Sequence, residues 1–554
     1  MEIKLPTPQF ASISVAAFSW GLEGFVLLGL VGLLTIAVSI FLLSSKSIDS
    51  QLPPGPTAWP IIGNLHQLGQ QNLHLVLWEM SKKYGPVMRL WMGSHLLVVV
   101  SSAQAAAEFM KVQDKAWASR PPTVAGEIFN NNYDDIVWAP YGNHWRHLRK
   151  ICSVEFFSPK RLETFRARRT EELSLMIKTI FQDGEKGEVV RLGVKLGHLS
   201  SNTITRILLN KRFFEADTAG EKDSHIFKEL IVELFTISAP LLIGDFIPWL
   251  NWVTTVSGFK ARMNKAKANI DSFLQTFLEF KKSKLRQQQK IQKKPQAAGS
   301  TNEEEHADEE QQFDPEADLV DALMAQPSED GKGNLSEDSV KGIIQDMLLA
   351  GTDTNSLTVE WGLAELLRNP IVMTKLQNEL DTVIGKDRIV TETDLPHLPY
   401  LEAVTKEVFR LHPTVPLGIP HESVQVTRVL GFKFPTKTRL FLNIYAIQRD
   451  PMVWERPLEF DPERFIKNPE INPRGNYLQL IPFGAGRRMC VGMPMAVLFV
   501  PVGLARLVHS FDFALPRGED PLKLDMTETL GLTIPRTHPL CVHPKPRLPN
   551  HLYL

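Results

Sequence analysis

One short stretch near the C-terminus, residues 482–492, constrains the fold of this chain most strongly. It reads Pro-Phe-Gly-Ala-Gly-Arg-Arg-Met-Cys-Val-Gly, so glycines punctuate a loop and Cys490 stands just before an apolar segment that predicts a helix. Glycine allows close or unusual backbone approaches. The N–H groups at a helix start should lower the pKa of a nearby thiol and favour the thiolate. A thiolate held in this way can be the axial ligand of a haem iron.

The neighbours of Cys490 suit a haem. Phe483 offers a flat apolar wall and Gly484 an open backbone, while Arg488 can pair with a carboxylate such as a haem propionate. The alternative is a buried structural cysteine in a glycine-rich turn. Against it, the full pattern F-x-x-G-x-R-x-C-x-G is present and resembles the haem-binding signature of the cytochrome P-450 superfamily. Its fixed residues are Phe483, Gly486, Arg488, Cys490 and Gly492.

Length and composition favour one large catalytic domain. Length alone, 554 residues, would suggest about three or four domains, but the sequence holds no internal repeat and one linker-like segment. Lys+Arg (61) and Asp+Glu (62) nearly balance, which gives no argument for nucleic-acid binding. The three cysteines, Cys152, Cys490 and Cys541, form no disulfide framework and suit a reducing compartment. No C-x-x-C or H-E-x-x-H pattern occurs, so a zinc site is not expected.

The N-terminal region predicts a membrane anchor and a stiff connection. After a mixed segment, residues 1–24, positions 25–43 form a run of 19 residues without a charge, and such a helix spans roughly 28 Å, close to the hydrocarbon thickness of a bilayer. We favour a retained anchor over a cleaved signal peptide, whose apolar region is normally shorter and follows net positive charge. Residues 44–64, with Leu-Pro-Pro-Gly-Pro, predict an extended strut and resemble the proline-rich hinge of microsomal cytochromes P-450. The catalytic domain then covers residues 65–554.

Patterns assign several segments of this domain. Residues 87–100 read as two strands around Gly93-Ser94, a short hairpin. Residues 121–136 look like a loop rich in Asn and Asp, and residues 160–280 are mostly helical in pattern. From 281 to 318 the composition becomes polar and of low complexity, which predicts a disordered loop. A role as an interaction tail is the less favoured alternative.

Trp145 and Arg149 stand at i and i+4, so they share one face of a predicted helix. An indole N–H and a guanidinium on that face could both donate to a propionate. The alternative is a core tryptophan beside a solvated arginine. Together with the cysteine loop, the pair resembles the W-x-x-x-R helix of the same family.

A long helix is predicted from about Ser336 to Asn369, closed by Pro370. Its middle reads Ala-Gly-Thr-Asp-Thr-Asn (350–355), although Gly, Thr and Asp are mediocre or poor helix formers. An exposed polar patch is the alternative, but the flanking residues look buried. The run resembles the family motif [AG]-G-x-[DE]-T over the haem, which implies that Thr354 and Asp353 are catalytic residues that carry protons.

Glu407 and Arg410 stand at i and i+3 on a shorter helix, 398–411. A surface ion pair would contribute little. The match to the family motif E-x-x-R instead implies a buried structural triad with Arg464 that holds the cysteine loop against the core. His421 stands where relatives often carry Arg and is a candidate propionate donor. Pro501 should kink the helix that follows Cys490, which departs from the family pattern.

The resemblance runs from Pro53 to the C-terminus and is closest to the land-plant, microsomal branch. It implies a mainly α fold with small β-sheets (α+β), the cytochrome P-450 fold preceded by an N-terminal transmembrane helix. It implies haem b with Cys490 as the axial iron ligand, and O2 and NADPH as co-substrates. The partners are then NADPH–cytochrome P-450 reductase, membrane lipid and a lipophilic small molecule, with no nucleic acid. The reaction is insertion of one oxygen atom into a plant phenolic, a terpenoid or a fatty acid. The location is the endoplasmic reticulum membrane, single-pass, with the catalytic domain on the cytosolic face.

Two surfaces follow from this interpretation. Arg146, Lys150, Lys160 and Arg161 are predicted to help form a basic docking face for the reductase. The expected substrate contacts are residues 121–136, 235–250, the helix side near Leu349, and 414–419. Two other functions stay open: a haem-thiolate isomerase or dehydratase that needs no reductase, and a non-catalytic membrane haem protein.

Overall fold

The computed structural model describes residues 51–69, 72–214, 229–231, 233, 242–292 and 319–553, together with positions 29 and 32. Within these residues helices predominate and the strands form three small sheets. The predicted mainly α fold with small sheets is therefore confirmed. The predicted membrane anchor, 25–43, lies outside the described residues apart from those two positions, and so does most of the predicted loop 281–318.

The largest sheet has the strand order β1-β2-β7-β4. Strands β1 (Val87–Met92) and β2 (His95–Val100) form an antiparallel hairpin that pairs Met92 with His95, which confirms the predicted turn at Gly93-Ser94. Strand β7 (Arg439–Leu442) runs parallel to β2, and β4 (His421–Glu422) pairs with β7. The sheet therefore brings His421 and Arg439 from late in the chain next to an early hairpin.

Two smaller sheets complete the β-structure of the described residues. The first has the order β3-β9-β8 and the second consists of the hairpin β5-β6. Their bounds are β3 Val190–Arg191, β9 Cys541–Pro546, β8 Phe511–Ala514, β5 Thr427–Val429 and β6 Phe432–Phe434.

The helices carry most of the chain. Those before the long polar segment are α2 Leu65–Leu68, α3 Leu73–Tyr84, α4 Ala103–Ala107, α5 Val124–Phe129, α6 Asn143–Glu155, α7 Pro159–Thr164, α8 Arg166–Glu185, α9 Leu192–Leu209, α11 Asn251–Val256 and α12 Phe259–Gln292. Those after it are α13 Leu319–Met324, α14 Glu337–Arg368, α15 Pro370–Val383, α16 Pro399–Leu411, α17 Ile444–Ile447, α18 Glu463–Lys467 and α19 Met493–Ser510. A π-helical turn covers Glu108–Val112, and short 3-10 turns cover Asp114–Trp117, Ile243–Asp245, Pro248–Leu250, Glu392–His397, Gly486–Arg488, Pro516–Gly518, Pro521–Lys523 and Asn550–Leu552.

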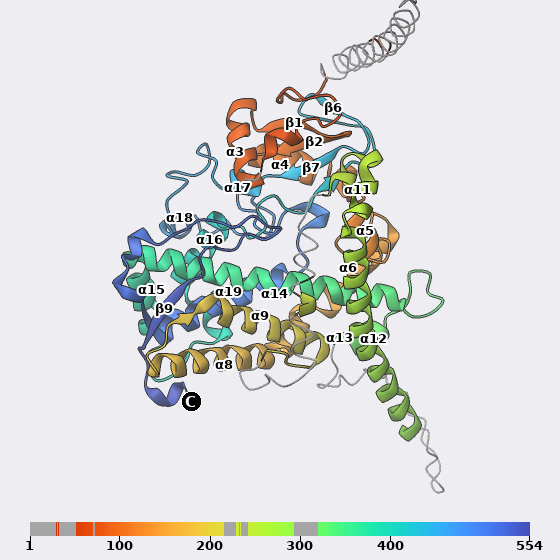
Figure 1. Cartoon of the computed structure of the whole chain (residues 1–554). Coiled ribbons are helices and arrows are strands. Elements are labelled where there is room, and N and C mark those ends of the chain that lie inside the picture. The colour runs from red at the N-terminus through yellow and green to blue at the C-terminus, as the bar shows by residue number, and fades with distance from the viewer. Residues whose placement is uncertain are drawn as a thin grey trace, which may run out of the picture.

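Helix α14 crosses the middle of the molecule (Figure 1). Ser336 caps its start, because the Ser336 hydroxyl accepts a hydrogen bond from the N–H of Ser339 at 3.0 Å. Its end at Arg368 precedes Pro370, so the predicted helix 336–369 is confirmed within one residue. The helix packs against α9, α16 and α19 and is buried on all sides over much of its length, as expected for a core helix.

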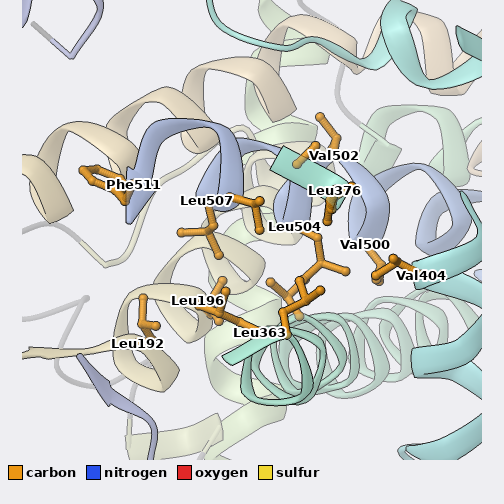
Figure 2. Close-up of a cluster of buried hydrophobic side chains, with 14 of the residues drawn as sticks. Leu192, Leu196, Leu363, Leu376, Val404, Val500, Val502, Leu504, Leu507 and Phe511 are labelled. Atoms are coloured by element: carbon orange, nitrogen blue, oxygen red, sulfur yellow. The ribbon is translucent and has the colours of Figure 1, made fainter. Parts of the chain in front are cut away.

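Helix α19 lies inside the main apolar core. In Figure 2, Leu504 and Leu507 of α19 lie beside Leu363 of α14 and Leu196 of α9, and all four side chains are fully buried. Among the described residues α19 alone is long and apolar enough to cross a membrane, yet 78% of it is buried in the protein, so it is a core helix. Pro501, predicted to kink it, is buried within an unbroken α19.

Three segments differ from the prediction in detail. The proline-rich residues before α2 are extended and packed on β1, because the N–H of Arg89 donates to the carbonyl of Pro54 at 2.9 Å. The loop 121–136 contains the short helix α5. Helix α12 continues to Gln292, beyond residue 281 where a disordered loop is predicted to begin, because its basic and glutamine-rich end is a good helix former.

Candidate functional site

A cavity of about 840 Å³ lies between the cysteine loop, α14 and the segments 120–138 and 414–421. Cys490 is exposed, and the surface that it exposes lines this cavity. The lining includes part of each segment that was expected to contact a substrate; of the segment 235–250, residues 235–241 lie outside the described residues. From the predicted segments the lining residues are Pro121, Thr123, Ala125, Phe129, Asn130, Ile136, Asp245, Phe246, Leu349 and the whole run Thr414–Ile419.

Glycines shape the loop that presents Cys490. Gly484 and Gly486 have positive φ angles of 72° and 71°, a conformation that side chains other than glycine rarely adopt. A Cβ atom on Gly486 would lie 2.6 Å from the carbonyl oxygen of Met110, so the loop packs closely on that backbone. The N–H of Cys490 donates to the carbonyl of Phe483 at 2.9 Å, which closes the loop.

The Cys490 thiol lies at the start of α19, as predicted. The N–H groups of Gly492 and Met493 point at the sulfur. The cavity that Cys490 faces lies inside the protein, and this removal from bulk water raises the pKa of the thiol above its ordinary value; the N–H of Gly492, the Arg149 guanidinium and the N–H of Met493 offset this only in part. The expected lowering of the pKa is therefore wrong for the free thiol, because desolvation disfavours the charged sulfur more than these donors favour it. A bound cation would replace the proton.

Arg488 is buried near the sulfur, with its guanidinium 4.2 Å above the ring of Trp145. Its N–H groups donate to backbone carbonyls, at 2.6 Å to Ala118 and 2.5 Å to Ala139. The indole N–H of Trp145 donates to the carbonyl of Ile136 at 3.0 Å. In this structure both predicted propionate donors therefore hold the loop that precedes α6.

Arg120 is a second buried cation that the sequence reasoning missed. Its Nη1 donates to the carbonyls of Ile419 and Pro420 at 2.7 and 2.8 Å. Burial and the neighbouring Arg488 hold the pKa of Arg120 well below its usual value, so these two cations repel each other across the cavity wall. No local sequence pattern singled out Arg120.

His421 and Arg149 complete the polar end of the cavity. The Nδ1 of His421 lies 2.9 Å from the carbonyl of Trp117, and a carbonyl only accepts, so Nδ1 carries a proton. Burial, Arg120 and Arg488 hold the pKa of His421 well below its usual value. The neutral ring then presents Nε2 as an acceptor, so a propionate would have to bring its own proton or raise this pKa.

These side chains fit the carboxylates of a haem. Among the described residues, Arg120 and Arg488 find only backbone carbonyls as hydrogen-bond partners, and Arg149 has no side-chain hydrogen bond. Buried cations without an anion are costly. Two buried cations and the half-buried Arg149, at one end of a cavity whose floor carries a thiol, match a large flat cofactor with one metal and two carboxylates.

The polar turn of α14, residues 350–355, forms another wall of the cavity that Cys490 lines. Thr354 lines the cavity and its hydroxyl donates to the carbonyl of Ala350 at 2.8 Å. Asp353 lies behind this wall: its Oδ2 accepts from the hydroxyl of Thr533 at 2.6 Å, and burial raises the pKa of its carboxyl. Thr533 itself lines the cavity. The two neighbouring residues therefore have different partners, and that of Asp353 lies 180 positions away in the sequence.

Glu407, Arg410 and Arg464 come together under the cysteine loop. Glu407 accepts from Nε and Nη2 of Arg410, both at 2.8 Å, and from Nε of Arg464 at 3.0 Å. Gln448, which no sequence pattern singled out, joins this group to the loop. Its Nε2 donates to the carbonyl of Arg410 and its Oε1 accepts from the N–H of Ile481, both at 2.9 Å. Phe483 packs edge-on against Phe409 of α16, 5.2 Å away.

The predicted docking face is only partly free. Arg146, Lys150 and Lys160 are exposed on α6 and α7. Arg161 is half-buried and its guanidinium contacts the carboxylate of Glu155 at 2.5 Å, so its charge is neutralised within the protein.

Comparisons with known proteins agree with this geometry. A sequence model of the family described as cytochrome P450 matches residues 53–542. The flavonoid 3'-monooxygenase of Petunia hybrida is 41% identical over 517 residues, covering 92% of this chain and 95% of the relative. The flavonoid 3',5'-hydroxylase of Gentiana triflora is 39% identical over 507 residues, covering 91% and 92%. A zebra fish cytochrome P450 solved with progesterone has a TM-score of 0.67 at 26% identity, covering 86% of this chain and 99% of that one.

The geometry of the cavity and the similarity to known proteins point to the same family. A thiol on the floor of a large cavity lies beside arginines that form no ion pair with another described residue. The family match covers nearly the whole catalytic region, and plant monooxygenases are similar over at least nine-tenths of the chain. This chain therefore belongs to the cytochrome P450 family and is a haem-dependent plant monooxygenase.

Proposed function

We propose that the protein hydroxylates the aromatic ring of a flavonoid or a related plant phenolic. The observation that carries this proposal is the cavity above Cys490, whose lining is mainly apolar, with charged groups gathered at its polar end and a few hydroxyl and amide groups elsewhere. A planar aromatic substrate with scattered hydroxyl groups suits such a lining. The similarity to flavonoid 3'-monooxygenases and a flavonoid 3',5'-hydroxylase supports the same substrate class.

In this proposal the Cys490 thiolate would hold the haem iron, and Arg120, Arg149 and Arg488 would hold the haem carboxylates. When bound, the haem supplies an iron whose thiolate ligand favours cleavage of the O–O bond of O2. The chain itself positions the substrate and moves protons. The Thr354 hydroxyl holds a proton at the cavity wall, and Asp353, which accepts a hydrogen bond from the cavity-lining Thr533, holds a second proton behind it. A carboxyl with a raised pKa retains a proton at higher pH than an ordinary aspartate.

The protein also needs an electron donor and a place in the cell. Electrons come from NADPH through a flavoprotein reductase that docks on Arg146, Lys150 and Lys160. Residues 25–43 anchor the protein once in the endoplasmic reticulum membrane, with the catalytic domain on the cytosolic face, and the proline-rich residues 44–64 connect the two. The length and apolar character of 25–43 support the anchor.

The test is turnover in membranes that contain the full-length protein and a plant reductase. Pooled flavonoids are supplied with and without NADPH, under air and under nitrogen, and the products are screened for a mass gain of one oxygen atom. A hydroxylated flavonoid that requires NADPH and O2 supports the proposal, and the Cys490→Ser variant should give none. Conversion of a fatty-acid hydroperoxide without NADPH would point to an isomerase or dehydratase, and no turnover of any kind to a non-catalytic haem protein.

A further inference from the structure

Two buried carboxylic acids, Asp135 and Asp346, meet beside the cavity and take no part in the function proposed above. Asp135 belongs to the loop 134–139 and is fully buried, and Asp346 lies on α14 with 5% exposure. The amide of Asn130 donates to both, at 2.6 Å to Asp135 and 3.4 Å to Asp346. The two carboxyls also lie within hydrogen-bonding reach of each other. We name these two side chains the carboxyl pair.

The carboxyl pair holds the backbone of the loop. Asp346 accepts hydrogen bonds from two consecutive N–H groups through Oδ2, and Asp135 accepts the next two through Oδ1. The donors are Ile136 at 3.0 Å and Val137 at 3.2 Å to Asp346, then Trp138 at 2.9 Å and Ala139 at 2.8 Å to Asp135. Residues 136–138 line the cavity, so the pair attaches one wall of the cavity to α14.

The same loop is bound from its other side by the cysteine loop. Arg488 donates to the carbonyl of Ile136 at 3.4 Å and to that of Ala139 at 2.5 Å. The loop 134–139 therefore lies between the loop that presents the thiol and the helix that carries Thr354. A shift of the loop away from α14 would move the cavity wall and loosen the setting of Arg488 together.

The surroundings of the pair disfavour two negative charges. In the described part of the chain, no arginine or lysine hydrogen-bonds to either carboxylate, since the nearby Arg488 gives its N–H groups to carbonyls. Burial and then the charge of Asp135 raise the pKa of Asp346 well above its usual value, and burial likewise raises the pKa of Asp135. Two like charges in one buried site cannot both ionise at neutral pH.

Other ionisable groups face the pair from the elements packed around it. Arg488 and Arg120 lie on the Asp135 side and favour its ionised form, whereas Asp134 opposes it. His144 on α6 also faces Asp135, and Cys152 on α6 faces Asp346. The half-buried His144 also contacts Asp134 at 2.7 Å, so a test has to separate that contact from the carboxyl pair.

We propose that the carboxyl pair is a positioning device that holds the loop 134–139, and with it one wall of the cavity, against α14 by sharing a single proton. If the loop leaves α14, both carboxyls enter water and ionise near the ordinary value of about 4. Opening then releases one proton, and the attached state binds more protons than the open one. The attachment is therefore strongest at acid pH. It weakens by up to about tenfold per pH unit as the pH rises from about 4, until the pair itself ionises.

Hydrogen–deuterium exchange of the peptide that contains residues 134–141 tests this in the full-length haem protein. The variant Asp346→Asn keeps the shape of the side chain and one acceptor oxygen. Its NH2 group can donate a hydrogen bond to Asp135 in place of the shared proton, and it does not titrate. The substitution lies outside the peptide, so the intrinsic exchange rate of the peptide is identical in both proteins at every pH. Between about pH 6 and pH 8.5 the ratio of wild-type to Asp346→Asn exchange should rise about tenfold or more.

Two control variants separate other causes. Asp338→Asn makes the same chemical change at an exposed position of α14 and should match the wild type at every pH. His144→Gln removes the contact with Asp134 and should keep the full pH slope. A ratio that does not change with pH, or a slope that His144→Gln abolishes, would overturn the proposal.

A second measurement follows the affinity of the cavity for a small ligand. 4-Phenylimidazole binds haem iron and shifts its Soret band, so it can be titrated into the wild type and into Asp346→Asn at the same pH values. The wild type should lose affinity relative to the variant by about threefold or more across this range. Equal affinities at all pH values would show that the pair does not position the wall, even if the loop exchanges faster.

Discussion

Replacing Glu407 by glutamine should destabilise the protein by about 3–5 kcal/mol. The side chains of Glu407 and Arg410 are both 0% exposed, and their closest atoms are 2.8 Å apart. The carboxylate also accepts from Nε of Arg464 at 3.0 Å and from the N–H of Asp461 at 2.8 Å. Glutamine keeps the shape but removes the charge and one acceptor, because its NH2 group only donates.

The magnitude follows from what the substitution leaves behind. Arg410 and Arg464 are both buried, and a guanidinium does not lose its proton in a protein. Two buried cations would then face a neutral amide, and the cost is that of an uncompensated buried charge rather than that of the lost ion pair. A change of about 1.4 kcal/mol is tenfold in an equilibrium constant, so the ratio of folded to unfolded protein should fall by roughly two to four orders of magnitude.

Chemical unfolding followed by the Soret band measures this change. Arg456 and Glu459 provide a matched control, since they are also three residues apart and 2.8 Å from each other but 53% and 60% exposed. Glu459→Gln should change the free energy of unfolding by less than about 0.5 kcal/mol. A loss of under about 1 kcal/mol for Glu407→Gln, or equal losses for both variants, would refute the argument from burial.

Three further outcomes are expected. Cys490→Ser should abolish the red-shifted Soret band of the reduced carbon-monoxide complex, and an unchanged band would reject Cys490 as the axial ligand. Thr354→Ala should uncouple NADPH consumption from product, measured as a lower ratio of product to NADPH; full coupling would count against a proton role. Charge reversal of Arg146 and Lys150 should slow reduction by the reductase in a salt-dependent way, whereas unchanged stopped-flow rates would place the docking face elsewhere.

Local patterns predicted those parts of the site that depend on sequence neighbours. The loop that ends in Cys490 needs positive φ at Gly484 and Gly486, and only glycine supplies that without strain. Polar residues in the middle of α14 broke an apolar helix pattern and so marked the cavity wall. The spacing of Glu407 and Arg410 placed both on one face of α16.

Contacts between distant segments of the chain could not be predicted from the sequence. Thr533 reaches Asp353 across 180 residues, and Arg120 reaches Ile419 across 299. Neither position carries a local signal, because a threonine or arginine in a loop is most often solvated. The same holds for Gln448, whose side chain bridges α16 and the cysteine loop, and for the direction of the Cys490 pKa, which depends on how deeply the sulfur is buried.

The amino-acid sequence by itself determined that a thiol would stand at a helix start behind a glycine-rich loop, since short-range backbone preferences act over a few residues. Only the tertiary structure decided which buried charges share that site. Burial sets the cost of each charge, and burial arises when segments far apart in the chain pack together. The pairing of Asp135 with Asp346 shows this most clearly: in the sequence they are two ordinary aspartates, and in the fold they compete for one proton.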